Sequence, residues 1–213
     1  MGLQHLSAAI LAGGRAARLG GRAKALLPLG GTRIVDRQIA ALREALAPGE
    51  PFIVSNDAGT YEPLGLRVVP DRIDGAGALG GLVTAMAESA AEATIVLACD
   101  LPFVTAAFVR WLAAECRGYD VALPKTADGY HPLCACWSHR ALAELERRAS
   151  SGHRRIIDAL SALRVREIGP GEVARFDRPA GTLLFNVNTP HDYERALQLI
   201  ESYHDRHHAP DAS

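Results

Sequence analysis

Short apolar runs alternate along the chain with longer stretches in which apolar residues recur at helical spacing. An uninterrupted apolar run that ends in a turn or an acid predicts a buried strand, and such runs occupy residues 8–11, 52–55, 66–71, 94–100, 121–124, 131–137 and 165–168. Helical periodicity predicts helices over residues 34–46, 82–90, 105–115, 138–148, 156–163 and 191–203. Alternating strands and helices are typical of an α/β fold with a mostly parallel sheet.

The ends of these elements carry recognisable signals. Thr32 is expected to cap the helix over 34–46, and Pro48-Gly49 ends it. Pro190 opens the final helix. A last apolar run covers 183–188. With no internal repeat, low-complexity segment or linker, we expect one domain over residues 1–203, followed by a polar, disordered tail over 204–213.

Composition narrows the class of protein. The 213 residues are 48% apolar with a net charge of −1, which favours a globular protein without a general affinity for nucleic acid or anionic membranes. No apolar run approaches the roughly 20 residues of a membrane-spanning helix, and residues 1–7 lack the pattern of a signal peptide. The four cysteines lack zinc-site spacing. We therefore expect a cytoplasmic protein with reduced, buried thiols at Cys99, Cys116, Cys134 and Cys136.

The stretch Leu11–Lys24 follows the first predicted strand and concentrates glycines and basic residues. Glycine pairs at Gly13-Gly14 and Gly20-Gly21 allow close backbone approach to a ligand. The basic side chains add charge suited to phosphate oxygens, at Arg15, Arg18, Arg22 and Lys24. Lys24 is followed by Ala25, so the stretch is not a Walker loop. It predicts a polyphosphate cradle, and a ligand-free surface loop is the alternative.

Acids and amides end other predicted strands. Asp71 and Asp100 close apolar runs, so a parallel sheet would bring both to the edge where ligands bind. An acid there is costly to bury unless it is paired or binds a metal, and Asp100 beside phosphates would hold Mg²⁺. A helix cap or turn is the alternative. Asn186 and Asn188 would face one side of a strand and orient phosphates, or else serve turn chemistry before Pro190.

Taken together, these motifs resemble the MobA-like nucleotidyltransferases over nearly the whole chain. The matching segments, in order, are 11–26, Asp71, 77–81, 98–103, 131–133 and 185–190. The resemblance implies a Rossmann-like three-layer α/β/α fold of the nucleotide-diphospho-sugar transferase type. It also implies Mg²⁺-dependent transfer of GMP from GTP to the phosphate of molybdopterin, with release of pyrophosphate. GTP, molybdopterin and other molybdenum cofactor assembly proteins are the implied partners, without nucleic acid or membrane.

The resemblance assigns roles to individual residues. Guanine and ribose would contact Leu11, Ala12, Gly13 and Gly14. Arg18 and Lys24 would hold the triphosphate, and Asp100 would bind Mg²⁺, so these three residues are the implied catalytic set. Further nucleotide contacts are implied at Ser55 and Asp71, with Asn56 beside the first. Asn186 and Asn188 would lie on the acceptor side; weaker candidates there are His131 and Arg154-Arg155.

One departure from the family pattern bears on activity. The family has Gly-Gly-x-Asp-Lys, whereas this chain has Gly20-Gly21-Arg22-Ala23-Lys24. If the acid orients the lysine, its loss favours a catalytically weakened, nucleotide-binding protein of the same fold. A sister enzyme that transfers CMP from CTP, or another small-molecule nucleotidyltransferase, is the nearer alternative. The Gly13-Gly14 pair resembles the guanylyl branch.

Overall fold

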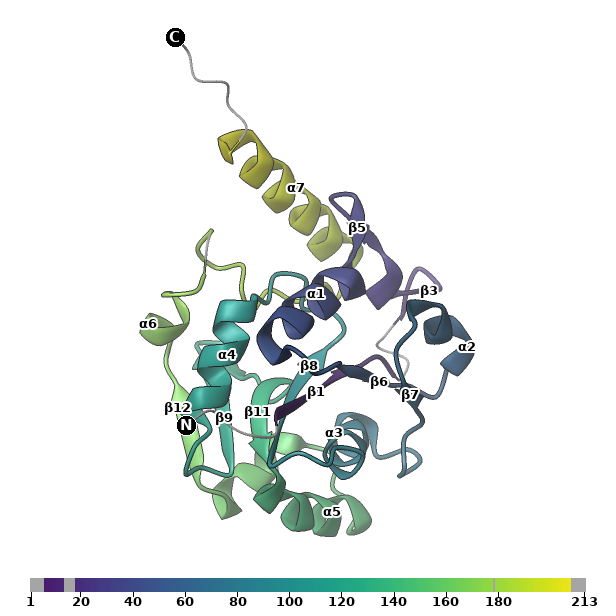
Figure 1. The fold of residues 1–213 in the computed structure, drawn as a ribbon, viewed down its shortest axis with the longest axis vertical. Helices are drawn as coiled ribbons and strands as arrows, with labels where there is room; N and C mark the ends of the chain where they lie inside the picture. Colours follow the sequence, from purple (N-terminus) through teal and green to yellow (C-terminus); the bar gives the residue numbers. More distant parts are fainter. Residues whose placement is uncertain (1–5, 14–17, 178, 208–213) are drawn as a thin grey trace.

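The computed structural model describes residues 6–13, 18–177 and 179–207, which fold around one eight-stranded sheet (Figure 1). The strand order is β7-β6-β1-β8-β11-β9-β10, with β12 beside β9. β1 pairs in parallel with β6 and β8, and β11 runs antiparallel to β8 and β9. The strands are β1 (Leu6–Leu11), β6 (Phe52–Val54), β7 (Val68–Val69), β8 (Ala93–Ala98), β9 (Val121–Thr126), β10 (Gly129–Tyr130), β11 (Cys134–Ser138) and β12 (Val165–Ile168).

Helices cover both faces of this sheet (Figure 1). One face carries α1 (Ile34–Leu46) and α4 (Ala106–Glu115), and the other carries α3 (Gly77–Ala87) and α5 (Leu142–Ser150). Successive side chains of β1 enter opposite layers, so Ile10 packs with the first pair of helices and Ala9 with the second. The predicted three-layer α/β/α fold with a mostly parallel sheet is confirmed.

Several predicted elements differ in their bounds. The helix predicted over 82–90 covers Gly77–Ala87 instead. Gly80 lies inside it, and a Cβ there would lie 2.7 Å from the Ala76 Cβ, so the glycine permits close packing. The strand predicted over 66–71 is limited to Val68–Val69 (β7). The strand predicted over 131–137 covers Cys134–Ser138 (β11). Residues 183–188 form no strand. The short helices are η2 (Lys24–Leu26), α2 (Ala58–Tyr61), η3 (Glu62–Leu64), η4 (His139–Ala141), η5 (Ile156–Ala162) and α6 (Pro170–Val173).

Two glycine pairs close two-residue hairpins near the start of the chain. Gly20 and Gly21 (φ 56° and 81°) join β2 (Arg18–Leu19) to β3 (Arg22–Ala23). The pair at 30–31 (φ 63° and 85°) joins β4 (Pro28–Leu29) to β5 (Thr32–Arg33). Two positive φ angles in succession match the type I′ turn, which glycine favours. Gly20 and Gly21, the second glycine pair of the Leu11–Lys24 stretch, therefore serve a hairpin turn.

The start of α1 differs from the prediction in one residue. Thr32 lies in β5, and the residue that precedes the helix is Arg33. The Arg33 N–H donates to Asp36 Oδ2 at 3.2 Å, and its guanidinium pairs with the same carboxylate at 2.7 and 2.8 Å. The helix end is thus satisfied by an acid in its first turn and not by a threonine hydroxyl.

We expect Gly30→Ala to destabilise the protein more than Gly20→Ala, although both glycines hold the same turn position. Each alanine would adopt a strained positive φ, at a cost of about 1–2 kcal/mol. At Gly30 the added Cβ would also lie 2.5 Å from Ile200 Cγ2, whereas nothing lies within 4 Å at Gly20. Overpacking adds about 1–3 kcal/mol. Urea unfolding measures the difference, and equal losses would contradict the packing argument.

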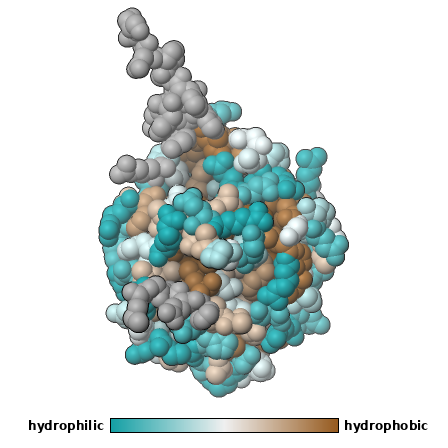
Figure 2. Space-filling view, in the orientation of Figure 1, coloured by the Kyte–Doolittle hydropathy of each residue, from teal (hydrophilic) through white to brown (hydrophobic). Residues whose placement is uncertain are grey.

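The final helix, α7 (Pro190–His207), packs on the β4–β5 hairpin and then leaves the body of the molecule (Figure 1). It continues past Tyr203, so residues 204–207, predicted to belong to a frayed tail, are helical; 208–213 lie outside the described residues. On the face seen in Figure 2, apolar residues reach the surface in several patches on the body of the molecule, between hydrophilic residues. Among the described residues, no helix combines the length and apolar content needed to cross a bilayer.

Candidate active site

The carboxyl ends of four parallel strands meet at one edge of the sheet, in the order β7-β6-β1-β8. After β1 the chain continues to β6 on one side, whereas β8 pairs with β1 on the other side. This edge therefore contains the switch in strand order at which α/β sheets bind ligands. The residues that follow these strands are the ones predicted from the sequence: Ala12-Gly13, Ser55-Asn56, Asp71 and Asp100.

The end of β1 is held rigidly between its neighbours. The Ala12 N–H donates to Val54 O at 2.9 Å, and Cys99 N–H donates to Leu11 O at 3.1 Å. Gly13 is exposed beside Asp71: a Cβ on Gly13 would lie 3.7 Å from Asp71 Oδ2. The missing side chain leaves space in front of a carboxylate. Gly14 lies outside the described residues, and of Arg18 only the backbone, paired with Ala23, is described.

Ser55 and Asn56 divide the roles expected at the end of β6. Ser55 is buried; its hydroxyl donates to Ala12 O at 3.2 Å and accepts from Asp57 N–H at 3.1 Å. Asn56 is exposed, and its side chain accepts from the Asp71 N–H at 2.7 Å and donates to Asp71 Oδ2 at 3.4 Å. The hydroxyl therefore fixes the turn after β1, while the amide and the Asp71 carboxylate are available at the surface of the site.

Asp71 sits among groups that disfavour its charge. Burial raises the pKa of its carboxyl, and the nearby Asp74 raises it further. A Cβ at Gly81 in α3 would lie 3.6 Å from Asp71 Oδ1, so the start of that helix also approaches the carboxylate closely. A carboxylate in such surroundings is suited to accept hydrogen bonds from a ligand's hydroxyl or amine groups.

Lys24, Asp100 and Asn188 come together on the other side of β1. Lys24 is 3% exposed and begins the short helix η2 (Lys24–Leu26); its Nζ donates to Asn188 Oδ1 at 2.8 Å, across 164 positions of sequence. Burial raises the pKa of Asp100, while the positive charge of Lys24 lowers it. The Val187 N–H donates to Asp100 O at 2.9 Å, which joins the asparagine segment to the end of β8.

Asp100 has a carboxylate oxygen that forms no hydrogen bond in the described part of the structure. Its Oδ1 is buried and has no hydrogen-bond partner among the described residues. Buried carboxylate oxygens are costly to leave without a partner. The described residues contain no group of three or more His, Cys, Asp or Glu side chains that could hold a metal alone. A single buried carboxylate oxygen is a ligand that suits Mg²⁺, which takes few protein ligands and shares its coordination with substrate oxygens and water.

Asn186 and Asn188 line the same cavity, of about 520 Å³, although they do not belong to a strand. Asn186 Nδ2 donates to Leu184 O at 3.0 Å. His131 also lines this cavity; its Nε2 lies 2.9 Å from Thr126 Oγ1, and burial lowers its pKa. Asn188 links this cavity to Lys24, whose Nζ donates to its Oδ1. Arg154 and Arg155 are exposed and do not line it.

Asp192 was not predicted from the sequence and holds Asn188 in place. Its Oδ2 accepts from the N–H groups of Asn188 and Thr189, at 3.0 and 2.8 Å. Thr189 Oγ1 accepts from Asp192 N–H at 3.1 Å, so the two form a reciprocal cap at the start of α7. The Thr-x-x-Asp pattern over 189–192 is the signal that could have identified it.

The cysteine thiols are not suited to take part in this chemistry. All four are buried and free, as predicted for their burial, and Cys134 and Cys136 share one face of β11. Burial raises the pKa of both Cys99 and Cys134 to about 12. Thiols held neutral in this way are poor nucleophiles and poor metal ligands.

Comparison with known proteins identifies the family of this chain. Residues 8–165 match the model of the MobA-like NTP transferase domain. The chain is 35% identical to a probable molybdenum cofactor guanylyltransferase of Pelotomaculum thermopropionicum, over 91% of this chain and 92% of the relative. It is 34% identical to another from Carboxydothermus hydrogenoformans, over 93% and 98% of the two chains.

Solved structures show the same fold. The molybdopterin-guanine dinucleotide biosynthesis protein A of Archaeoglobus fulgidus superposes with a TM-score of 0.76 at 28% identity, covering 92% of this chain and 99% of that one. A CMP:2-keto-3-deoxy-manno-octonic acid synthetase complexed with CTP reaches a TM-score of 0.68 at 16% identity, over 94% and 100% of the two chains, which shows the fold alone. The family resemblance of the sequence is confirmed: the chain belongs to the MobA-like NTP transferase family.

Proposed function

We propose that this protein transfers GMP from GTP to the phosphate of molybdopterin and releases pyrophosphate. The observation that carries the proposal is the grouping of three side chains: Lys24 Nζ donates to Asn188, the charge of Lys24 acts on Asp100, and Asn188 lines a cavity. Two relatives at 34–35% identity are named probable molybdenum cofactor guanylyltransferases, which supports the choice of substrates.

In this proposal the nucleotide lies over the turn after β1. Leu11, Ala12 and Gly13 approach guanine and ribose through their backbone, and Gly14 would extend that contact. Asp71, held by Asn56, accepts hydrogen bonds from the nucleotide. Ser55 does not contact the nucleotide; its hydroxyl holds the Ala12 carbonyl in position by a hydrogen bond. Lys24, together with Arg18, holds the triphosphate.

The acceptor occupies the cavity lined by Asn186 and Asn188. Its phosphate is largely ionised at neutral pH, since the second pKa of a phosphate monoester is about 6, so no general base is required. An acceptor oxygen attacks the α-phosphorus of GTP, a new phosphoanhydride bond forms, and the bond to the β-phosphate breaks to release pyrophosphate. Lys24 offsets the charge that gathers on the phosphate oxygens, and the cavity positions the acceptor in line.

The residues present also suit a divalent cation, which we propose is Mg²⁺. The buried, unpartnered Asp100 Oδ1 is the atom that would hold it. When bound, the cation supplies positive charge to the phosphate oxygens. Asp100 thus acts as the anchoring carboxylate, and Asn188 keeps Lys24 directed toward the same region.

Ala23 favours a second candidate, a nucleotide-binding protein with weak or no turnover. It lies half-buried in β3 and carries no group that could orient the neighbouring Lys24. The Asn188 amide contacts the lysine Nζ in its place, which supports the enzyme over the inactive binder. A CTP-dependent enzyme would differ from this proposal in the nucleobase, cytosine in place of guanine, that binds at the turn after β1.

We expect GTP to raise the melting temperature, and more so with Mg²⁺. A ligand at one hundred times its Kd adds about 2.7 kcal/mol, or roughly 5–10 °C for a chain of this length. Incubation with α-labelled GTP, Mg²⁺ and molybdopterin should then yield a labelled dinucleotide and pyrophosphate. CTP and ATP serve as matched controls. A larger shift with CTP would assign the sister activity, and binding of GTP without turnover would assign the inactive binder.

A further inference from the structure

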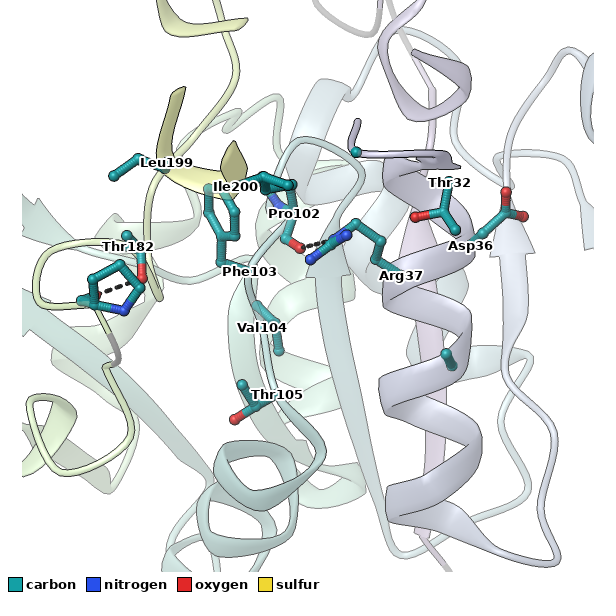
Figure 3. Close-up of a pocket in the computed structure, with 13 residues that line it drawn as sticks. Thr32, Asp36, Arg37, Pro102, Phe103, Val104, Thr105, Thr182, Leu199 and Ile200 are labelled. Carbon is teal, nitrogen blue, oxygen red and sulfur yellow. Dashed lines mark hydrogen bonds between the residues drawn. The ribbon is translucent and has the colours of Figure 1, made fainter. Parts of the chain in front are cut away.

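A second cavity, of about 530 Å³, lies between α1, the loop after β8 and α7 (Figure 3). It shares no lining residue with the cavity that contains Asn186 and Asn188. Its volume falls within the range of about 300–1,000 Å³ that is usual for small-molecule sites. Nothing in the proposed transfer reaction uses it.

Most of the wall is apolar. Phe103 and Val104 come from the loop after β8, and Leu199 and Ile200 come from α7 (Figure 3). Ala40 contributes from α1. Such a surface favours an apolar ring or chain, which would lose its contact with water on entering.

Arg37 is the polar feature that gives this cavity chemical character. It reaches from α1 toward the loop after β8, where its Nε donates to Pro102 O at 3.3 Å (Figure 3). The guanidinium is partly buried, and burial alone lowers its pKa. Within the described part of the chain it forms no ion pair. Its neighbour Asp36, which also lines the cavity, is already paired with Arg33.

A partly desolvated guanidinium without a carboxylate partner retains N–H donors for an anion. Thr105, the N-cap of the ten-residue helix α4, lines the same cavity, so the positive end of that helix also faces it. We propose that this cavity is a second binding site, which takes a small organic anion: a carboxylate or phosphate group, paired with Arg37, on an apolar body.

The site adjoins the catalytic edge through the chain itself. Pro102 and Phe103 follow Asp100 by two and three residues, and Thr182 precedes the segment that carries Asn186. The inference nevertheless does not depend on the proposed transfer reaction, because its test measures binding alone.

Calorimetric titration of the full chain, with excess GTP present to fill the nucleotide site, tests the proposal. Benzoate and phenyl phosphate are the probes, benzamide is the neutral match to benzoate, and inorganic phosphate lacks the apolar body. We expect saturable binding of one equivalent of benzoate or phenyl phosphate. Loss of a charge-assisted pair corresponds to about 10- to 100-fold in affinity, so benzamide should bind that much more weakly.

Three variants locate the binding. Arg37→Gln should weaken benzoate binding by the same about 10- to 100-fold. Ala40→Trp, at an exposed position of α1, should abolish binding by filling the cavity. Arg43→Gln is the matched control, because Arg43 lies on the same helix, pairs with Glu50 and does not line this cavity. It should leave the affinity unchanged.

The opposite results would overturn the proposal. Equal affinity for benzamide would remove the role of charge, and unchanged binding in both Arg37→Gln and Ala40→Trp would place the probe elsewhere. Absence of binding by every probe would show that the cavity takes no such anion. A protein that turned over no GTP but bound benzoate through Arg37 would retain this inference, so the two proposals fail separately.

Discussion

Replacing Asp100 with Asn is expected to abolish turnover while the protein stays folded. The change removes the buried carboxylate that we propose anchors the divalent cation. Without the cation, its positive charge no longer offsets the negative charge of the phosphates. Loss of one preorganised electrostatic contact of this kind typically lowers kcat by about 10²–10³-fold, and loss of the cation should exceed that. A turnover assay with α-labelled GTP measures the loss. Mg²⁺ should no longer add to the melting-temperature shift given by GTP.

The same variant should be at least as stable as the parent at neutral pH. Burial raises the pKa of Asp100 above its value in the unfolded chain. The folded state therefore binds the proton more tightly, and this contribution to stability is present below about pH 4 and is lost as pH rises through the folded pKa. Asn has no such dependence. The variant's advantage should appear near pH 7 and vanish at acid pH.

Asp158→Asn is the matched control, because it removes one exposed carboxylate far from any proposed role. It should leave turnover, Mg²⁺ dependence and melting temperature close to those of the parent. Normal turnover in folded Asp100→Asn would contradict the metal assignment. A variant that melted lower than the parent at neutral pH would instead contradict the argument that burial disfavours this charge.

Replacing Lys24 with Met is expected to lower kcat by about 10³-fold, because the side chain keeps its bulk but loses the charge proposed to offset that on the phosphates. Lys24 is almost fully buried, so an apolar replacement of similar length should be accepted by the fold. Steady-state turnover of GTP measures the effect. Unchanged kcat, with only weaker GTP binding, would assign Lys24 to ground-state binding alone.

Asn188→Ala tests whether the 2.8 Å contact with Lys24 Nζ directs that charge. Alone it should cost about tenfold in kcat, the value of one hydrogen bond to a charged group. Combined with Lys24→Met it should cost nothing further, because the contact is already gone. Additive losses in the double variant would mean that the asparagine acts on the substrate independently of the lysine.

The pattern of apolar residues predicted the strands and helices that form the body of the fold. The helix over 34–46 has the predicted bounds, because its apolar positions fall on one face and Pro48-Gly49 ends it. The strand at 8–11 and the order of the elements were likewise predicted. A buried strand or an amphipathic helix can be predicted from local sequence, because burial imposes a regular spacing on the apolar residues.

The sequence was less informative where glycines serve packing. Gly20-Gly21 form a hairpin turn, and Gly80-Gly81 lie inside a helix against neighbouring side chains. A glycine in a sequence signals that a side chain would be unfavourable, but not whether the obstacle is a backbone angle, a packed neighbour or a ligand. Only the surroundings distinguish these causes.

The contacts within the candidate site were also decided by the fold. Lys24 meets Asn188 across 164 positions, and Asn56 holds Asp71 while Ser55 is turned inward. A one-residue step along a strand end reverses the direction of a side chain, so motif position alone could not choose between Ser55 and Asn56. The anion cavity at Arg37 likewise gave no signal in the sequence.

By itself, therefore, the sequence determined the α/β class, the alternation of elements, the family and the carboxylates that end the strands. Each of these depends on local periodicity or on motifs that are contiguous in the chain. The tertiary structure decided which side chains meet, which oxygen of Asp100 is buried without a partner, and where the cavities lie. Those properties arise from contacts between distant segments, and they depend on how the layers pack around the sheet.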